Sequence, residues 1–229
     1  MNFSIFLSGW LLKPSVSTFG PQIDSIYYVI LWITGIIFVL TEAALVLFSI
    51  LYRQKEGQKA HYTHGNTTVE IIWTTIPALL LVYMGITSQN LWSEMRQPAL
   101  FPSKPTVIKV LAEQWIWHFR YPGPDGVFGT EDDIIVDNSF HVPLDQPIRF
   151  EVTAQDVIHG FYLPDLRVHQ DAVPGLTSLV WLQANKTGAY DLRCTQFCGT
   201  NHYQMKGEMT VDTPQDYQAW LANSKAAAF

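Results

Sequence analysis

Two long apolar runs constrain this chain more than any other feature of its sequence. Residues 25–52 carry one charged side chain, Glu42, and residues 71–93 carry none. Each run is long enough for a helix that crosses about 30 Å of hydrocarbon, which needs roughly 20 apolar residues. Helices buried in soluble domains are usually shorter and keep a polar face. The sequence therefore predicts a transmembrane helical hairpin over residues 25–93, with spans at 25–52 and 70–92.

Charges beside the two runs predict the orientation of the hairpin. Residues 53–68, which join the runs, contain Arg53, Lys55 and Lys59 against one acidic residue, Glu56. Short loops rich in Lys and Arg tend to stay in the cytoplasm. We therefore expect this connection to face inward, and both termini and the rest of the chain to lie on the outer side.

The N-terminal stretch is a poor match to a cleaved signal peptide. Residues 3–12 are apolar, but no positive segment precedes them and Lys13 follows. A signal peptide has a positively charged segment before its apolar core. The sequence thus favours an uncleaved exported segment over residues 1–24.

Three residues in or beside the spans have special expectations. Glu42 lies within the first span, where an ionisable group is costly and usually faces protein or a wet cavity, so a packed, protonated side chain is an equal alternative. Glu70, at the start of the second span, is explained as an interfacial residue. Pro77 should bend the second helix, because it removes a backbone donor and crowds the preceding turn.

After residue 93 the sequence changes to short runs rich in Val, Ile, Trp, Phe and Thr, separated by turn residues. Several short strands without helical periodicity between them indicate an antiparallel sandwich or barrel, which we expect over residues 94–229. A helix should follow, with Thr213 as N-cap and Pro214 in its first turn. The expected strands are 106–111, 114–121, 134–138, 148–154, 178–184, 188–193 and 208–211.

Charge is confined to this C-terminal part. Of the 14 Lys and Arg and 20 Asp and Glu residues, only four of each sign precede residue 93, so the whole net charge of -6 lies beyond it. An acidic domain favours a basic partner and disfavours a nucleic acid.

One segment concentrates soft metal ligands. Cys194, Cys198, His202 and Met205 lie within twelve residues, and His159 stands upstream between strand-like runs. Thiolate, imidazole and thioether together are the donor set that copper prefers.

Other chemistries for the same residues remain open. Two cysteines in an exported domain are often a disulfide. Zinc would need four closed ligands, for which Met is a poor candidate. A single blue copper would use Cys198, His202, Met205 and His159 and would leave Cys194 idle. A centre in which both thiolates bridge two copper ions uses every residue, and spreading one electron over two metals reduces the rearrangement on reduction.

The pattern Cys-x-Gln-x-Cys-Gly-x-x-His-x-x-Met, with two N-terminal spans and a β-domain, resembles subunit II of cytochrome c oxidase, a haem-copper oxidase with a binuclear copper A centre. The resemblance extends from about residue 23 to the last expected strand. Further matching segments are residues 69–74, 114–117, 159–161 and 171–175.

This resemblance implies a cupredoxin-like Greek-key sandwich and a set of site residues. His159 and Met205 would bind one copper, and His202 and the Gln196 carbonyl the other. Trp115 matches the aromatic residue through which electrons from cytochrome c enter, although a core Trp in a strand is the alternative. Glu70 matches a carboxylate at the mouth of a proton channel. The implied copper ligands are His159, Cys194, the Gln196 backbone carbonyl, Cys198, His202 and Met205.

The resemblance also implies a function and partners. Electrons would pass from cytochrome c to a haem in subunit I, where oxygen is reduced and protons are translocated. Partners would be subunit I, subunit III, a basic cytochrome c and membrane lipid, with no nucleic acid. The outer side would be the periplasm of a bacterium rather than the mitochondrial intermembrane space.

Departures from the family pattern limit what carries over. Gln196 replaces the usual Glu, whose carboxylate contacts a magnesium ion shared with subunit I, so copper binding through the carbonyl is expected but magnesium is in doubt. Glu113 stands where a His is usual, and Ile116 replaces an aromatic residue. The docking surface is therefore expected to suit a different donor.

An acidic stretch and three other function classes complete the interpretation. Residues 124–133 are rich in oxygen-bearing side chains, but their spacing is not that of a complete calcium loop, which favours a solvated acidic hairpin.

A copper-storage or delivery module is the main alternative function. The copper domain of a nitrous oxide reductase is disfavoured by the two spans, and a quinol oxidase subunit of the same fold would lack the metal ligands.

Overall fold

The computed structural model describes residues 12–59, 62 and 64–224. These residues form two compact units. The hairpin unit consists of residues 24–90, and the β unit consists of residues from 91 onwards together with the N-terminal residues up to 23. Of the exported segment expected at 1–24, residues 1–11 lie outside the described part of the chain. Its remainder, up to residue 23, belongs to the β unit.

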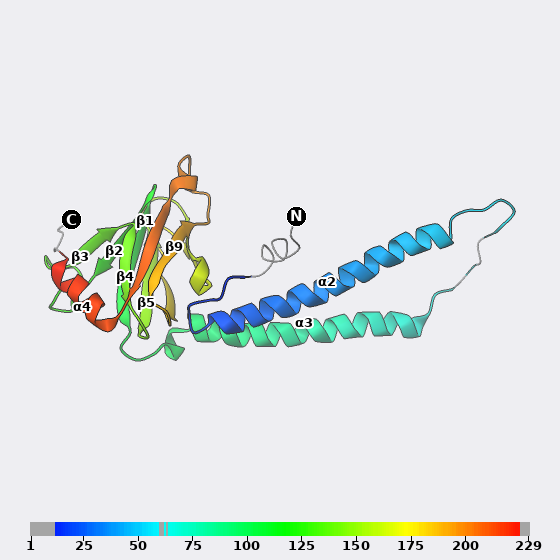
Figure 1. Ribbon diagram of the computed structural model, residues 1–229, viewed down its shortest axis with the longest axis horizontal. Helices are drawn as coiled ribbons and strands as arrows, with labels where there is room; N and C mark the ends of the chain where they lie inside the picture. The colour runs from blue at the N-terminus through cyan, green and yellow to red at the C-terminus, as the bar shows by residue number, and fades with distance from the viewer. Residues whose placement is uncertain (1–11, 60–61, 63, 225–229) are drawn as a thin grey trace. The chain divides into compact units, whose positions relative to one another are not determined.

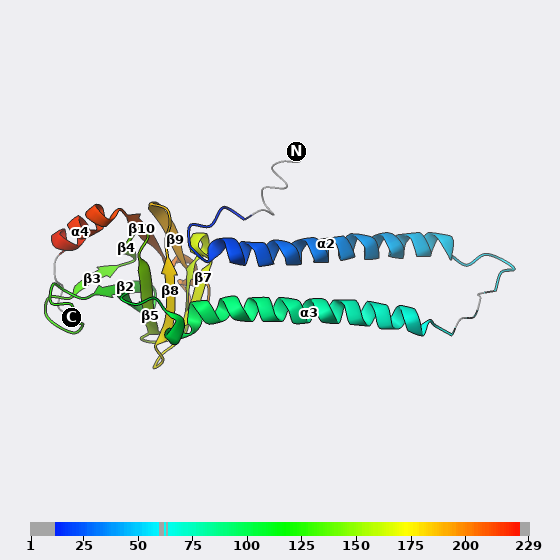
Figure 2. The same ribbon diagram turned by 90° about the horizontal axis from the view of Figure 1, so that it is seen from below.

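Both apolar runs form helices that run in opposite directions (Figures 1 and 2). Helix α2 (Gly20–Leu51) has 32 residues and helix α3 (Thr67–Arg96) has 30. At 1.5 Å per residue they are about 48 and 45 Å long, enough to cross a bilayer. Their most apolar windows have mean hydropathies of 2.3 and 1.8. Each helix begins before the expected span, and α3 continues through Pro77.

Thr34, Thr41, Ser49 and Thr87 satisfy their hydroxyl groups within their own helices. Thr34 donates to the Ile30 carbonyl at 2.7 Å, and Thr87 donates to the Tyr83 carbonyl at 2.9 Å. Hydrocarbon offers no hydrogen-bond partner, so polar groups in a span must be satisfied internally. Glu42 is exposed on the surface of α2.

The described part of the β unit contains two five-stranded sheets, ordered β3-β2-β1-β5-β8 and β4-β10-β9-β6-β7. Three short 3-10 helices accompany the strands: η1 (Pro98–Leu100) precedes β1, η2 (Pro164–Leu166) joins β6 to β7, and η3 (His202–Gln204) joins β9 to β10. The strands are β1 (Thr106–Glu113), β2 (Ile116–Tyr121), β3 (Ile134–Asp137), β4 (Ser139–Pro143), β5 (Pro147–Ala154), β6 (His159–Leu163), β7 (Val168–Ala172), β8 (Ser178–Gln183), β9 (Gly188–Cys194) and β10 (Lys206–Asp212).

The β-sandwich and all seven expected strand runs are confirmed, with three differences. Strands β4, β6 and β7 were not predicted, because β4 and β6 contain a His and end at or beside a Pro, and β7 consists largely of polar residues. Gln114 and Trp115 form the turn between β1 and β2 rather than part of a strand. The sheets are mixed, because β1 pairs with β5 and β4 pairs with β10 in parallel.

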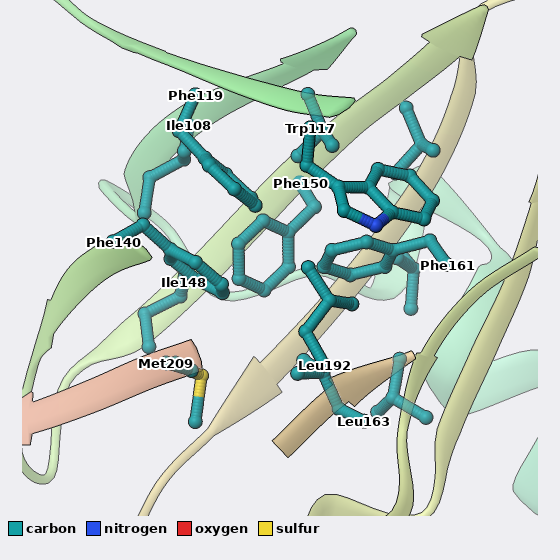
Figure 3. Close-up of a cluster of buried hydrophobic side chains, with 14 of the residues drawn as sticks. Ile108, Trp117, Phe119, Phe140, Ile148, Phe150, Phe161, Leu163, Leu192 and Met209 are labelled. Carbon is teal, nitrogen blue, oxygen red and sulfur yellow. The ribbon is translucent and has the colours of Figure 1, made fainter. Parts of the chain in front are cut away.

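An aromatic cluster fills the space between the sheets (Figure 3). Phe119 and Phe140, from different sheets, stack with their ring centroids 3.9 Å apart. Trp117, Phe150 and Phe161 surround this pair and are fully buried. Side chains of β5 alternate between buried and half-buried, as expected for a strand with one face on the core. Strands β6 and β9, which carry His159 and Cys194, contribute Phe161 and Leu192 to this core.

Residues 12–19 lie along the edge of the β unit. The Thr18 amide donates to the Gln183 carbonyl, and the Val16 amide donates to the Asp165 carbonyl. Ser17 is fully buried, and its hydroxyl donates to the Leu166 carbonyl at 2.7 Å. The segment that precedes α2 is therefore built into the same unit as the strands.

Helix α4 (Pro214–Asn223) closes the described chain, and its predicted start is confirmed. The Thr213 hydroxyl accepts from the Asp216 amide at 3.3 Å, and Pro214 occupies the first turn. Trp220 of this helix stacks on His141 of β4 at a centroid distance of 4.4 Å. The helix thus packs on the sandwich through an aromatic contact.

Candidate metal centre

Strand register brings distant ligands together. Strand β6 pairs with β9 so that Phe161 is opposite Cys194, and His159 is the first residue of β6. Beyond Cys194 the chain makes a loop and returns to β10. The Cys194 amide donates to the Met205 carbonyl at 3.1 Å, which closes the loop at its base. His159 and the cysteine loop therefore meet at one end of the sheet.

The two cysteines are free thiols. Their sulfur atoms are 3.7 Å apart, whereas a disulfide bond is about 2.05 Å long. Cys198 Sγ also lies 3.5 Å from His202 Nδ1 and 3.8 Å from Met205 Sδ. The geometry therefore disfavours the disulfide interpretation and leaves both sulfurs free to bind a metal.

The remaining predicted ligands lie around the same sulfur pair. His159 Nδ1 is 3.1 Å from Met205 Sδ, and the Gln196 carbonyl oxygen is 3.2 Å from Cys194 Sγ. His159 is fully buried, and Cys198 and Met205 are 3% and 2% exposed. Within the described residues, His159, Cys194 and Cys198 form the one group of three His, Cys, Asp or Glu ligands whose atoms lie within 4.8 Å of one another.

The donor set fits copper. Two thiols, two imidazoles and a thioether are soft ligands, and a weakly bound Met is typical of copper electron-transfer sites. Structural zinc prefers Cys, His or carboxylate ligands and gives no role to Met205. A single copper would leave one of two adjacent sulfurs unused, although both are free and face the same site.

The electrostatics of the site favour a thiolate at Cys194. Burial alone would raise the pKa of this thiol, but interaction with His159 and backbone amides lowers it below its usual value. Burial and the neighbouring Cys194 raise the pKa of Cys198. Burial would lower the pKa of His159, but Cys194 and Asp156 raise it. One negative sulfur is thus stabilised before any metal binds, and the thiolate is the form that binds metals.

A carboxylate orients the buried histidine. Asp156 Oδ1 lies 2.9 Å from His159 Nε2, so Nδ1 is left facing Met205. The other carboxylate oxygen accepts from the Gln114 amide at 2.8 Å. Histidines that bind metals commonly donate their second ring nitrogen to such a carboxylate, which fixes the tautomer and the ring orientation.

The turn between β1 and β2 lies against the cysteine loop. Gln114 Nε2 donates to the Cys198 carbonyl at 2.7 Å. A Cβ atom on Gly199 would lie 3.2 Å from the Trp115 ring, and Gly199 has a φ of +120°, which favours glycine. Trp115 is partly buried, and its ring packs beside the backbone that follows Cys198. It is therefore a turn residue next to the site.

Glu70 is not part of this centre, because it lies in the hairpin unit. It is an exposed residue in the first turn of α3. Asn66 caps this helix end by accepting from the Thr68 and Val69 amides. A carboxylate in the first turn also interacts favourably with the helix dipole, which supplies a structural reason for Glu70.

The acidic stretch at 124–133 joins β2 to β3, and its carboxylates serve local hydrogen bonds. Asp125 accepts from the Val127 amide at 2.8 Å, and Asp133 accepts from the Gly129 amide at 2.7 Å. Asp133 also lies 3.6 Å from Arg120 Nε. These bonds explain the acidic residues as parts of a turn.

Three residues at the site were not assigned a role from the sequence. Asp156 orients His159, the Gln114 side chain holds the Cys198 carbonyl, and Thr195 is tied to β6. The position of Asp156 three residues before a ligand histidine is a signal that could have identified it. Gln114 belongs to a segment that matches the family, but its contact with Cys198, like that of Thr195 with β6, depends on how remote segments are packed.

Comparison with known families matches both units of the chain. The family model described as the transmembrane domain of cytochrome c oxidase subunit II matches residues 7–91. That described as the periplasmic domain of the same subunit matches residues 124–211. The expected membrane protein with two spans is thereby confirmed.

Individual relatives agree with the family models. The alternative cytochrome c oxidase subunit 2 of Bradyrhizobium diazoefficiens is 29% identical, over 99% of this chain and 88% of its own. The probable cytochrome c oxidase subunit 2 of Rickettsia bellii is 30% identical, over 94% and 84%. The quinol oxidase subunit 2 of Bacillus subtilis is 29% identical, over 86% and 60%.

A solved structure is also similar. The periplasmic domain of cytochrome oxidase subunit II of Bradyrhizobium japonicum is 29% identical with a TM-score of 0.48, covering 54% of this chain and 95% of that one. The two apolar helices, the β-sandwich, the two family models and the subunit 2 relatives of Rickettsia and Bacillus together assign the chain to the subunit II family of cytochrome c and quinol oxidases.

Proposed function

We propose that this chain is the electron-accepting subunit of a terminal oxidase that uses cytochrome c. The observation that carries the proposal is the convergence of two free thiols, two imidazoles and a thioether at one end of the sandwich. A quinol oxidase subunit of this fold has no need of such donors. Their presence therefore favours the cytochrome c branch of the family.

The proposed ligands are His159, Cys194, the Gln196 carbonyl, Cys198, His202 and Met205. A binuclear copper A centre, when bound there, supplies one-electron transfer between a cytochrome c and a haem of subunit I. The residues around it keep His159 oriented, exclude water from the sulfurs and fix the loop on a rigid sheet. Such preorganisation limits the rearrangement that accompanies a change of charge. Magnesium is not included, because Gln196 lacks the carboxylate.

We assign Trp115 to the side from which the donor approaches. Its ring packs on Gly199, next to Cys198, and the turn that carries it also holds the Cys198 carbonyl through Gln114. The acidic β unit favours a basic donor, whose association should slow as salt screens the charges beyond a Debye length of about 10 Å at 0.1 M. A rate that does not depend on salt would contradict an electrostatic encounter.

The proposed orientation places the β unit and the segment before α2 on the outer side. Residues 12–19 pair with the β unit, so they must lie on the same side of the membrane as the strands. The basic connection between the helices then faces the cytoplasm. Subunit I, subunit III and lipid would surround the apolar faces of α2 and α3, and Glu70 would lie near the inner surface.

Electron paramagnetic resonance of the full chain, purified in mild detergent and loaded with copper, tests the metal centre. A binuclear centre predicts two copper ions per chain and a spectrum split by two equivalent copper nuclei. A spectrum from one copper nucleus, or a stoichiometry of one, would reject it. Replacing Trp115 with Phe in the complex should slow electron uptake from cytochrome c without changing this spectrum.

A copper-delivery module is the second candidate, because two free thiols whose sulfurs lie 3.7 Å apart at one end of the sandwich suit capture of a metal. The two functions differ in their partners. Purification of the chain in mild detergent should bring a haem-bearing subunit with it if the chain belongs to an oxidase. Isolation of a copper-loaded chain without haem, from cells that respire normally, would favour delivery.

A further inference from the structure

Thr195 occupies a position between two proposed ligands, and three strands define its surroundings. It directly follows Cys194, the last residue of β9, and precedes Gln196. Strand β6 lies between β9 and β7, so a residue of β7 is two strands away from the cysteine loop. Any contact between β7 and Thr195 therefore has to cross β6.

His169 of β7 makes that contact. Its Nε2 atom lies 2.8 Å from Thr195 Oγ1. His169 is paired with Tyr162 of β6 and packs against its ring with the centroids 5.9 Å apart. Asp171 Oδ1 lies 3.7 Å from the same ring nitrogen. The hydrogen bond to Thr195 is thus the shorter polar contact of this half-exposed histidine.

Gly160 of β6 leaves the space through which the Thr195 side chain reaches His169 of β7. A Cβ atom on this residue would collide with Thr195 Oγ1 and would lie 2.9 Å from the Gln196 amide. The Thr195 amide donates to the Gly160 carbonyl at 3.1 Å. Thr195 is therefore fixed at its amide by β6, at its hydroxyl by β7, and by close packing over a glycine.

The strand that carries His169 is itself held from a second side. Arg96, the last residue of α3 and part of the β unit, donates to the His169 carbonyl and to Gln170 Oε1. Its guanidinium also lies 4.9 Å from the centre of the Trp92 ring. The imidazole is thus presented to Thr195 by a strand held both by its neighbour β6 and by an arginine.

We propose that His169 and Thr195 are positioning residues that orient the Gln196 carbonyl and the Cys194 sulfur toward the metal. Thr195 is the one residue between Cys194 and Gln196, and the Gln196 carbonyl oxygen lies 3.2 Å from Cys194 Sγ. Holding Thr195 at both its amide and its hydroxyl restricts the backbone that sets where Cys194 and Gln196 lie relative to each other. This inference rests on the proposed copper function, because it concerns how the same site is shaped.

Replacement of Thr195 tests the pair with matched changes in size. Thr195→Val keeps the shape and removes the hydroxyl, whereas Thr195→Ser keeps the hydroxyl. In the copper-loaded full chain, Thr195→Val should lower copper affinity by about tenfold, as is typical for partners of metal ligands. It should also change the copper–thiolate absorption and make the two copper nuclei unequal in the resonance spectrum. Thr195→Ser should keep the copper affinity and the spectra of the wild-type chain.

His169→Ala provides a second variant whose folding is secure, because half of the imidazole is exposed. It should reproduce the effect of Thr195→Val, and the double variant should add nothing further. The control is Thr153→Val in β5 of the other sheet. It removes a hydroxyl bond to the carbonyl of Val173, the residue after β7, and should leave the spectrum unchanged.

The outcomes separate this inference from the proposed function. If the wild-type chain binds two copper ions but Thr195→Val and His169→Ala keep its affinity and spectrum, the positioning role is wrong and the function stands. If the wild-type chain does not form a binuclear centre, the proposed function fails, and the positioning role falls with it. Loss of affinity in the Thr153→Val control would show a general effect of stability and would also overturn the positioning role.

Discussion

Two loops of the β unit are rich in potential metal ligands, and they differ in where their donors point. In the loop from Cys194 to Met205, side chains from β6, β9 and the loop itself meet around a pair of sulfurs. In the acidic loop at 124–133, the carboxylates accept hydrogen bonds from amides and a hydroxyl of the same loop. A metal site requires donor atoms that converge on one point, which a ligand-rich sequence alone does not supply.

Burial separates the two loops as well. His159, Cys198 and Met205 are almost completely removed from solvent, whereas Asp125 and Glu131 are exposed, Asp132 is half-buried and only Asp133 of these carboxylates is buried. Polar donors that are buried together are not solvated by water, so a bound ion can supply the partner that they lack. Exposed carboxylates remain solvated and have little need of a cation.

The largest expected effect is the loss of the metal on replacing a sulfur. Cys198→Ser should abolish the binuclear centre, because Cys198 contacts Cys194, His202 and Met205 and is the most connected donor. Copper content and the resonance spectrum of the full chain measure the result. Asp125→Asn is the matched change in the acidic loop and should leave both unaltered. If Asp125→Asn lost as much copper as Cys198→Ser, the acidic loop would also contribute to metal binding, contrary to this prediction.

The acidic loop should matter for stability rather than for metal binding. Asp133 is 2% exposed, accepts from the Gly129 amide and lies near Arg120. Asp133→Ala should lower the free energy of unfolding by about 1–3 kcal/mol, because it removes the charged acceptor that bonds the Gly129 amide and lies near Arg120. Denaturant unfolding of the full chain in detergent, followed by tryptophan fluorescence, measures this change. A fall in copper stoichiometry at unchanged stability would contradict the structural role.

A smaller effect is expected from the carboxylate that orients His159. Asp156→Ala should lower copper affinity by about tenfold, equivalent to about 1.4 kcal/mol, because the imidazole loses the partner that fixes its tautomer. Competition with a copper chelator measures the affinity. Asp137→Ala is a suitable control, since Asp137 contacts His118 at 2.7 Å rather than a proposed ligand. Equal affinities in the wild-type and Asp156→Ala chains would show that the hydrogen bond does not support the ligand.

The sequence predicted the elements of this molecule better than the contacts between them. Both spans follow from apolar length alone, and the helix after Thr213 follows from its cap. Strand β6 was missed although it begins with a proposed ligand, because four of its five residues are buried and the strand shows no alternation. Residues 12–19 could not be placed beside the strands, since strand pairing between remote segments depends on the whole fold.

The metal centre shows the same limit at the level of single residues. The pattern from Cys194 to Met205 identified the donors, because their chemistry is local to one loop. The partners of these donors, Asp156 and Gln114, come from other loops, and their side chains are common in solvated turns. A role that depends on a hydrogen bond between remote segments, such as Gln114 to Cys198, needs coordinates.

The smallest expected effect is that of calcium on the acidic loop. The site most favourable to an ion is Asp133 Oδ1, which is buried and has no hydrogen-bond partner among the described residues. The neighbouring Asp132 already accepts from the Thr130 hydroxyl at 2.6 Å, and no third carboxylate of the described chain completes a group within 4.8 Å. If a calcium site existed, calcium at a hundred times its dissociation constant would stabilise the fold by about 2.7 kcal/mol.

We expect millimolar calcium to leave the unfolding transition unchanged in both the wild-type chain and Asp132→Asn. A calcium-dependent increase that Asp132→Asn removes would mean that the second loop also converges on a metal, and the contrast between the two loops would then be one of metal type.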